Sequence, residues 1–161
     1  MARKFQIGVM GSAADLKYSK EVEKAAYEVG RLIAEEGGIL FFGAEKDSDS
    51  LSTAACRGAK DADIMIPCGL ERGGGRETVL VTGCDAVIAI SGGSGTLTEL
   101  AIAYQADIPM VALAGYGGWA DKLADEYLDT RNRILTIGAA SPEEAVKKAF
   151  AAAAEYRRRY A

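Results

Sequence analysis

The sequence predicts an α/β protein with a doubly wound, mainly parallel sheet of five to seven strands and helices on both faces. Three observations predict this fold. Short apolar runs recur along the chain, segments with helical periodicity separate them, and glycine-rich turns stand where several of the runs end. No repeat, linker or low-complexity segment interrupts the alternation. We therefore expect residues 1–161 to form one domain.

The first strand and helix are marked clearly at both ends. Residues 5–10 form an apolar run that stops at Gly11 and Ser12. A helix is expected over residues 19–36, because apolar residues recur there at steps of three and four. The glycine pair at 37–38 is typical of a helix C-terminus.

The next stretch predicts two more strands around a short helix. We expect strands at residues 39–42 and 62–68 and a helix at residues 51–61. The acidic segment between the first of these strands and the helix contains Asp47 and Asp49, whose spacing fits no calcium loop. We interpret the segment as a polar loop that caps the helix, and we expect no metal site.

The second half repeats the pattern. Strands are expected at residues 85–90, 108–113 and 134–137, the last at a sheet edge, and helices at residues 77–83, 100–106 and 120–127. A final helix begins at Ser141, with proline at its first position and acids in its first turn. The arginines at 157–159 suit the C-terminus of that helix, and we favour this interpretation over a nucleic-acid tail.

Composition excludes several function classes. The chain has 161 residues, is 49% hydrophobic and carries a net charge of −4, which argues against a nucleic-acid partner. No apolar run could span a membrane. Histidine is absent, and the three cysteines form no pairing pattern, so we expect reduced thiols and a cytoplasmic location.

Residues 91–99 (Ser-Gly-Gly-Ser-Gly-Thr-Leu-Thr-Glu) carry the strongest functional signal. They lie where a strand turns into a helix, a place at which main-chain N–H groups and the helix dipole bind anions. Ser94 or Thr96 can add a hydroxyl donor, and Glu99 is expected on the first turn of the helix. A tight turn with a capping acid is the alternative interpretation. The candidate phosphate-binding residues are Gly92, Gly93, Ser94, Gly95 and Thr96, with Gly11 and Ser12 from the first strand.

Other loops should meet at the same edge of the sheet, because ligands of such folds bind beyond the carboxyl ends of the strands. Three consecutive glycines lie between Arg72 and Arg76, which could offer guanidinium groups to an anion or simply be surface arginines. Gly43 follows a strand and is a candidate loop contact. Gly115 and Tyr116 also follow a strand, and that aromatic loop could stack on a base or merely close the fold.

The motif at 91–99 resembles the P-G-G-x-G-T-x-x-E signature of the Lonely Guy phosphoribohydrolases. These enzymes were long labelled lysine decarboxylases, and they belong with the molybdenum-cofactor carrier proteins to one Rossmann-like superfamily. The resemblance extends to residues 7–12, 57–60 and 85–113. Arg76 lies at the distance before Glu99 at which the Lonely Guy enzymes have an arginine.

Three positions depart from the Lonely Guy pattern. Ser91 stands in place of the signature proline, and Glu77 follows Arg76 where those enzymes have lysine. Residues 43–51 replace their second glycine motif. The overall pattern is closer to the carrier-protein-like branch of the superfamily.

The resemblance implies two alternative functions. In the first, the protein hydrolyses the N-glycosidic bond of a nucleoside 5′-monophosphate, with Glu99 and Arg76 as catalytic residues and no required cofactor or metal. In the second, the same loops hold a nucleotide or molybdopterin without turnover. Both imply a small phosphorylated ligand and a homodimer or homotetramer.

Overall fold

The computed structural model describes residues 3–13, 16–43, 50–59 and 75–160. Within these ranges the sheet has five strands, all parallel, in the order β2-β1-β3-β4-β5. The strands are β1 (Gln6–Gly11), β2 (Ile39–Phe42), β3 (Ala86–Ile90), β4 (Met110–Leu113) and β5 (Ile137–Ala139). The helices are α1 (Lys20–Glu35), α2 (Leu51–Gly58), α3 (Arg76–Thr82), α4 (Ser94–Gln105), α5 (Gly118–Leu123) and α6 (Pro142–Tyr160).

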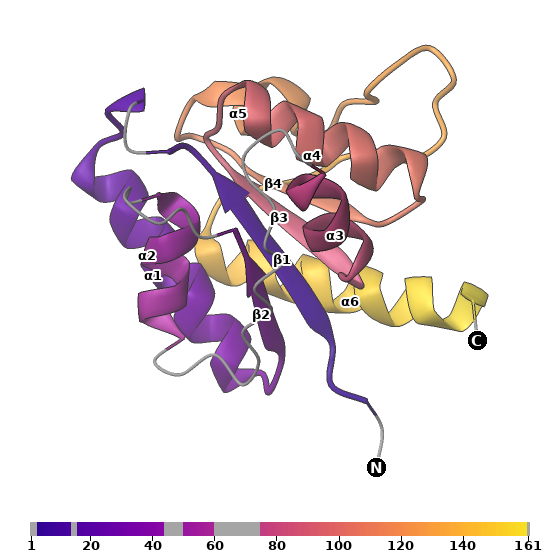
Figure 1. Ribbon diagram of the computed structural model, residues 1–161, viewed down its shortest axis with the longest axis horizontal. Helices are drawn as coiled ribbons and strands as arrows, with labels where there is room; N and C mark the ends of the chain where they lie inside the picture. Colours follow the sequence, from indigo (N-terminus) through magenta and orange to yellow (C-terminus); the bar gives the residue numbers. More distant parts are fainter. Residues whose placement is uncertain (1–2, 14–15, 44–49, 60–74, 161) are drawn as a thin grey trace.

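Helices cover both faces of the sheet, as Figure 1 shows. Because side chains alternate along a strand, β3 sends Ile88 and Ile90 into the core beneath α1, α2 and α6. Its neighbours Val87 and Ala89 join the opposite core, beneath α3, α4 and α5. Every residue of β3 is buried, as expected for a central strand covered on both sides. The fold class expected from the sequence is therefore confirmed.

The observed strand order places a topological switch point between β1 and β3. The chain leaves β1 for β2 in one direction and leaves β3 for β4 and β5 in the other. Loops diverge at such a point, beyond the carboxyl ends of the strands, and leave room there for a ligand.

Two expected elements near the C-terminus are displaced. The helix expected over 120–127 ends at Leu123, because Ala124 has a non-helical ψ of 120° and Asp125 has a φ of +60°. The edge strand expected at 134–137 lies at Ile137–Ala139 instead. Leu135 forms an antiparallel bridge with Tyr127, so pairing with β4 begins only at Ile137. Leu135 thus pairs with Tyr127 in a local bridge, and residues 134–135 do not belong to the sheet.

Some expectations lie outside the described residues. They are the strand at 62–68, most of the acidic loop at 44–49 and the glycine-rich loop up to residue 74, including Arg72.

Helices α1 and α2 approach each other unusually closely. A Cβ added to Gly30 of α1 would lie 1.8 Å from the carbonyl oxygen of Ala55, and one added to Gly58 of α2 would lie 1.8 Å from that of Tyr27. Only glycine permits this backbone approach. The contact fixes α2, whose first turn reaches the cavity described below.

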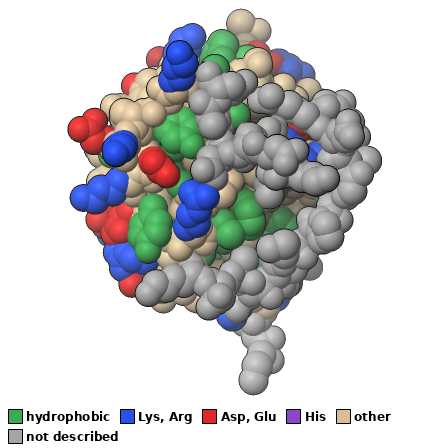
Figure 2. All heavy atoms as spheres, turned by 60° about the vertical axis from the view of Figure 1, so that its left-hand side comes forward, with side chains coloured by type: hydrophobic (Ala, Val, Ile, Leu, Met, Phe, Trp, Pro, Cys, Tyr) green, Lys and Arg blue, Asp and Glu red, His purple; other side chains and the backbone are tan. Residues whose placement is uncertain are grey.

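The face that carries α1 and α2 is turned forward in Figure 2, where basic, acidic and apolar side chains are interspersed. Within the described ranges, no helix combines the length and the apolar character needed to cross a membrane.

Candidate functional site

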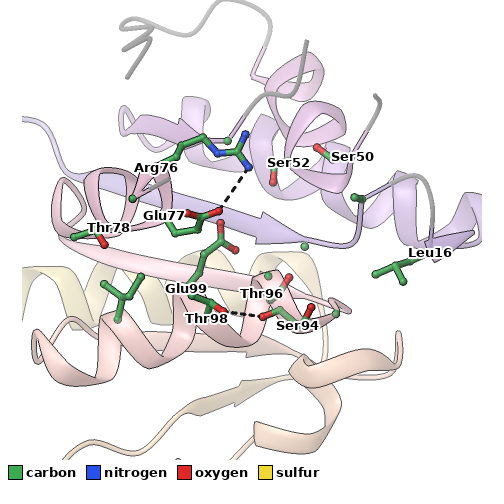
Figure 3. A pocket seen from close by; sticks show the side chains of 17 residues that line it. Leu16, Ser50, Ser52, Arg76, Glu77, Thr78, Ser94, Thr96, Thr98 and Glu99 are labelled. Carbon is green, nitrogen blue, oxygen red and sulfur yellow. Dashed lines mark hydrogen bonds and ion pairs between the residues drawn. The ribbon is translucent and has the colours of Figure 1, made fainter. Parts of the chain in front are cut away.

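A cavity of about 640 Å³ opens at the switch point, beyond the carboxyl ends of β1, β2 and β3 (Figure 3). Its described lining comes from the ends of these strands and from three helices. Strand ends and loops contribute Gly11, Ala13, Leu16 and Gly43. Helices α2 and α3, with the residues just before them, contribute Ser50, Ser52, Gly75, Arg76, Glu77 and Thr78. Gly93 and helix α4 contribute Ser94, Gly95, Thr96, Thr98, Glu99 and Ile102.

The N-terminus of α4 forms one wall of the cavity. Its N-cap is Gly93, which provides no side-chain hydrogen bond to the helix. The first N–H groups of a helix have no intrahelical partner, so those at the start of α4 can be donated to an anion. The helix begins at Ser94, which is earlier than expected from the sequence. Glu99 therefore lies in its second turn and not in its first.

The turn before α4 has a constrained backbone. Ser91 has a φ of +53° and Gly92 a φ of +100°. A Cβ on Gly92 would lie 2.5 Å from the side chain of Thr96, so the position has no room for any other residue. Trp119 N–H donates to the Gly92 carbonyl (3.0 Å) and Ala120 N–H to the Ser91 carbonyl (2.9 Å), which ties the turn to α5.

The Ser12 side chain holds this turn through two hydrogen bonds. Its hydroxyl donates to Ser91 Oγ (3.2 Å) and accepts from Gly92 N–H (2.9 Å). The side chain is buried, and neither Ser12 nor Gly92 is among the described lining residues. The Gly92 amide donates to Ser12, so in this structure the two residues shape the turn, and their expected contact with phosphate stays a prediction.

Helix α3 brings an arginine and a second carboxylate to the cavity. Arg76 and Glu77 begin this helix, directly after Gly75, which has a φ of +92°. Arg76 Nη2 lies 3.9 Å from Glu77 Oε1, and the two side chains are only 17% and 13% exposed. In Figure 3 the Glu99 carboxyl group points toward Glu77 and lies between Glu77 and the first turn of α4.

The carboxyl group of Glu99 has a raised pKa. Burial and the nearby Glu77 carboxylate raise the pKa of Glu99 to about 7, while Arg76 opposes the shift. A carboxyl group with this pKa can exchange protons near neutral pH, as a general acid or base requires. The cavity therefore combines helix N–H groups that are able to bind an anion with a side chain suited to proton transfer.

Helix α2 contributes two serines that the sequence analysis did not single out. Ser50 is its N-cap and accepts from Thr53 N–H (3.2 Å), and Ser52 is buried in the first turn of the helix. Glu77 was noted only as a departure from a family pattern. Its adjacency to Arg76 at the start of a helix was the signal that could have identified it as a lining residue.

Some of the candidate residues predicted from the sequence line the cavity, and others lie elsewhere. Gly11, Gly43, Arg76, Gly93, Ser94, Gly95, Thr96 and Glu99 line the cavity together. Gly115 and Tyr116 are not among the described lining residues, and both donate their amides to Asp121 Oδ1 (2.9 and 3.2 Å). In the described part of the chain, no three Cys, Asp or Glu side chains gather closely enough to hold a metal ion.

Fold and cavity together define a parallel α/β protein with a ligand cavity at the sheet's switch point. The sequence model of the SLOG cluster4 family matches residues 4–63 and 59–146, and the chain belongs to this family. It is also similar to an uncharacterized protein of Archaeoglobus fulgidus. The two are 35% identical over 114 residues, which are 61% of this chain and 72% of that protein.

Solved structures show the same fold. The molybdenum cofactor binding protein from Rippkaea orientalis is 28% identical, with a TM-score of 0.75 over 94% of this chain and 98% of that one. The molybdenum cofactor carrier protein from Chlamydomonas reinhardtii is 29% identical, with a TM-score of 0.74 over 92% of this chain and 99% of that one. The expected superfamily is thereby confirmed.

Proposed function

We propose that the protein binds a small phosphorylated ligand in this cavity, with the phosphate at the N-terminus of α4. The N–H groups of its first turn and the hydroxyls of Ser94 and Thr96 would donate to phosphate oxygens. Arg76 supplies a cation to the same cavity. The phosphate site is thus built mainly from backbone, which accords with the close packing around Gly92.

The ligand we favour is a nucleoside 5′-monophosphate, and the reaction is hydrolysis of its N-glycosidic bond. The position of Glu99 carries this proposal, because its carboxyl group lies beyond the phosphate site with a pKa of about 7. As a carboxylate it would accept a proton from water as the oxygen attacks C1′ of the ribose. Its negative charge would also stabilise the positive charge that develops on the sugar as the bond to the base breaks.

Incubation with AMP, GMP, CMP and UMP, followed by chromatography of the free bases, tests this proposal. Base and ribose 5-phosphate should form in equal amounts, and Glu99→Gln should reduce the rate by at least about a hundredfold. Glu126→Gln, which changes an exposed glutamate elsewhere, is the matched control. A Glu99→Gln variant as active as the original protein would exclude Glu99 as the catalytic base.

The second candidate function is a carrier that holds a nucleotide or molybdopterin without turnover. The names of the solved relatives favour it, because two that cover more than nine-tenths of this chain are described as molybdenum cofactor binding or carrier proteins. Arg76 and the α4 N-terminus would bind the cofactor's phosphate. Retention of molybdopterin through gel filtration, with no base released from any monophosphate, would favour the carrier over the hydrolase.

We also propose that residues 1–161 act as one domain, that the protein forms a homodimer or homotetramer, and that it is cytoplasmic. The partly buried apolar residues Leu97 and Ile102 of α4 motivate the oligomer. Light scattering tests it, and a monomer at all concentrations would contradict it.

A further inference from the structure

A second helix N-terminus, that of α2, reaches the cavity from the other face of the sheet. Helix α2 packs in the core on one face, and α4 packs in the core on the other. Ser52 of α2 nevertheless lines the same cavity as Ser94 and Thr96 of α4. The cavity is thus bounded by two helix N-termini, and each carries the positive end of a helix dipole.

Ser12 fixes the starts of these two helices close to each other. Its carbonyl oxygen accepts from Leu51 N–H (3.0 Å), at the first position of α2. Its hydroxyl accepts from Gly92 N–H (2.9 Å), in the turn before α4. β1 ends just before Ser12 and pairs with β3, and paired strands lie about 4.8 Å apart. The spacing of the two N-termini is therefore set by adjacent strands of the sheet.

The first turn of α2 presents a buried hydroxyl to the cavity. Ser52 is only 6% exposed, and Figure 3 shows its side chain among those that line the cavity. The Ser50 hydroxyl accepts from Thr53 N–H, but the Ser52 hydroxyl makes no hydrogen bond with any described residue. Burying a hydroxyl without a partner costs free energy. A hydroxyl in this position inside a cavity therefore indicates contact with a ligand.

Helix α3 brings a positive charge to the same end of the cavity. In Figure 3 the Arg76 side chain, which forms an ion pair with Glu77, extends from α3 toward Ser52. A cation there adds to the attraction that the α2 dipole exerts on an anion. The Glu99 carboxyl group lies between this end and the start of α4 in the same view. Because a carboxylate repels phosphate, it keeps two bound anionic groups apart.

We propose that Ser52 and the N-terminus of α2 form a second anion subsite, and that the ligand is a nucleoside with phosphates on both sides of its ribose. This proposal rests on the proposed phosphate site at α4. The 5′-phosphate lies at α4 and the ribose lies beside Glu99. A phosphate on the 2′ or 3′ oxygen accepts from the Ser52 hydroxyl, and the α2 dipole and Arg76 balance its charge. A 5′-diphosphate does not meet this requirement, because both its phosphates lie on one side of the ribose.

Calorimetric titration with AMP, ADP and the 2′,5′- and 3′,5′-bisphosphates of adenosine tests the second subsite. At least one bisphosphate should bind at least about tenfold more tightly than AMP and ADP, because hydrogen bonds to charged groups are among the stronger ones. The tighter of the two bisphosphates identifies the ribose oxygen that carries the second phosphate. Ser52→Ala should reduce this advantage to below about threefold and leave the affinity for AMP unchanged.

The melting temperature separates a ligand contact from a structural role. Because the Ser52 hydroxyl makes no hydrogen bond with a described residue, Ser52→Ala should not lower the melting temperature of the ligand-free protein. Thr130→Ala removes an exposed hydroxyl from the segment between α5 and β5, and it should leave the affinities and the melting temperature unchanged. A lower melting temperature for Ser52→Ala, with equal losses of affinity for AMP and bisphosphate, would show a structural hydroxyl and overturn the subsite.

The outcomes distinguish the two proposals. Equal affinities for AMP and both bisphosphates, an equal gain with ADP, or a bisphosphate preference that survives in Ser52→Ala would overturn the second subsite, while the phosphate site at α4 stands. Failure of AMP, ribose 5-phosphate and both bisphosphates to bind would overturn the phosphate site itself.

Discussion

Glu99 links the chemistry of the site to the stability of the protein. Burial and Glu77 raise its pKa from 4.5 to about 7, so the folded chain binds a proton more tightly than the unfolded chain does. Between these two pH values the free energy of unfolding therefore falls as pH rises. Above pH 7 the cost of holding the charged carboxylate approaches about 3 kcal/mol.

Replacing Glu99 with glutamine should remove that cost. At pH 8 we expect Glu99→Gln to raise the free energy of unfolding by up to about 3 kcal/mol, and near pH 4.5 the two proteins should be equally stable. Urea unfolding at a series of pH values measures the difference. Glu126→Gln should show no such pH-dependent gain, and a constant difference for Glu99→Gln would contradict the raised pKa.

The same titration predicts the pH dependence of catalysis. If Glu99 is the general base, kcat/KM should rise with pH and level off above about pH 7, because only the carboxylate accepts a proton from water. Initial rates with a nucleoside monophosphate between pH 5 and 9 measure the profile. A rate that falls through pH 7 would indicate that the protonated form is the active one.

Ser91 gives a physical reason for one departure from the Lonely Guy pattern. Its φ of +53° lies in the left-handed region, whereas a proline ring fixes φ near −65°. We expect Ser91→Pro to lower the free energy of unfolding by about 3 kcal/mol or more. Ser91→Gly should stay within about 1 kcal/mol of the original protein, since relief of the backbone offsets the lost contact with Ser12. Thermal unfolding of both variants measures the two changes in stability. A Ser91→Pro protein as stable as the original would contradict the positive φ described for this turn.

At the scale of elements, most of the fold could be predicted because buried positions carry apolar residues at regular spacings in the sequence. β3 is covered on both faces and is apolar throughout, and α1 shows its buried stripe and its Ser19 cap directly. The strand expected at 134–137 was misplaced because an apolar pair in a local bridge has the same pattern as an edge strand. The site was less predictable, because Ser52 reaches the cavity through tertiary packing, which no local pattern encodes.

The crossing of α1 and α2 is an element-scale constraint that two helical glycines test. Gly30→Ala would push a methyl group against the Ala55 carbonyl and force the helices apart, and we expect a loss of about 1–3 kcal/mol of stability. A Cβ on Gly95, in α4, meets no atom within 4 Å, so Gly95→Ala should gain up to about 1 kcal/mol from helix propensity. Chemical denaturation measures both. An increase in the free energy of unfolding of Gly30→Ala as large as that of Gly95→Ala would contradict the close approach of α1 and α2.

At the scale of the whole molecule, Asp85 joins the first strand, the central strand and the last helix. It lies just before β3 and is 2% exposed. Its carboxylate accepts from Gln6 N–H (2.7 Å), Arg3 Nη2 (2.9 Å) and Arg157 Nε (2.8 Å). The arginines at 157–159 were expected only to favour the helix C-terminus, which misses this long-range contact. A side chain 72 residues away along the chain cannot be paired by local sequence patterns.

Arg157 should therefore matter far more than its neighbour in sequence. It also donates to the carbonyl groups of Arg3 and Lys4 and lies over the Phe5 ring, so Arg157→Ala would leave a buried carboxylate with fewer donors. We expect a loss of about 3–5 kcal/mol, because one partner of a buried ion pair is removed. Arg158→Ala, at an exposed position one residue on, should cost less than about 0.5 kcal/mol.

The pH dependence of the same variant separates charge from packing. Burial would by itself raise the pKa of Asp85, but hydrogen bonds from Arg157 and the Gln6 amide hold it below its usual range. This group therefore stabilises the protein above its unfolded-state pKa, and that stability is lost as pH falls below it. The difference between the original protein and Arg157→Ala should accordingly shrink in acid. A difference that stays constant down to pH 2 in urea titrations would mean that Arg157 acts only by packing on Phe5.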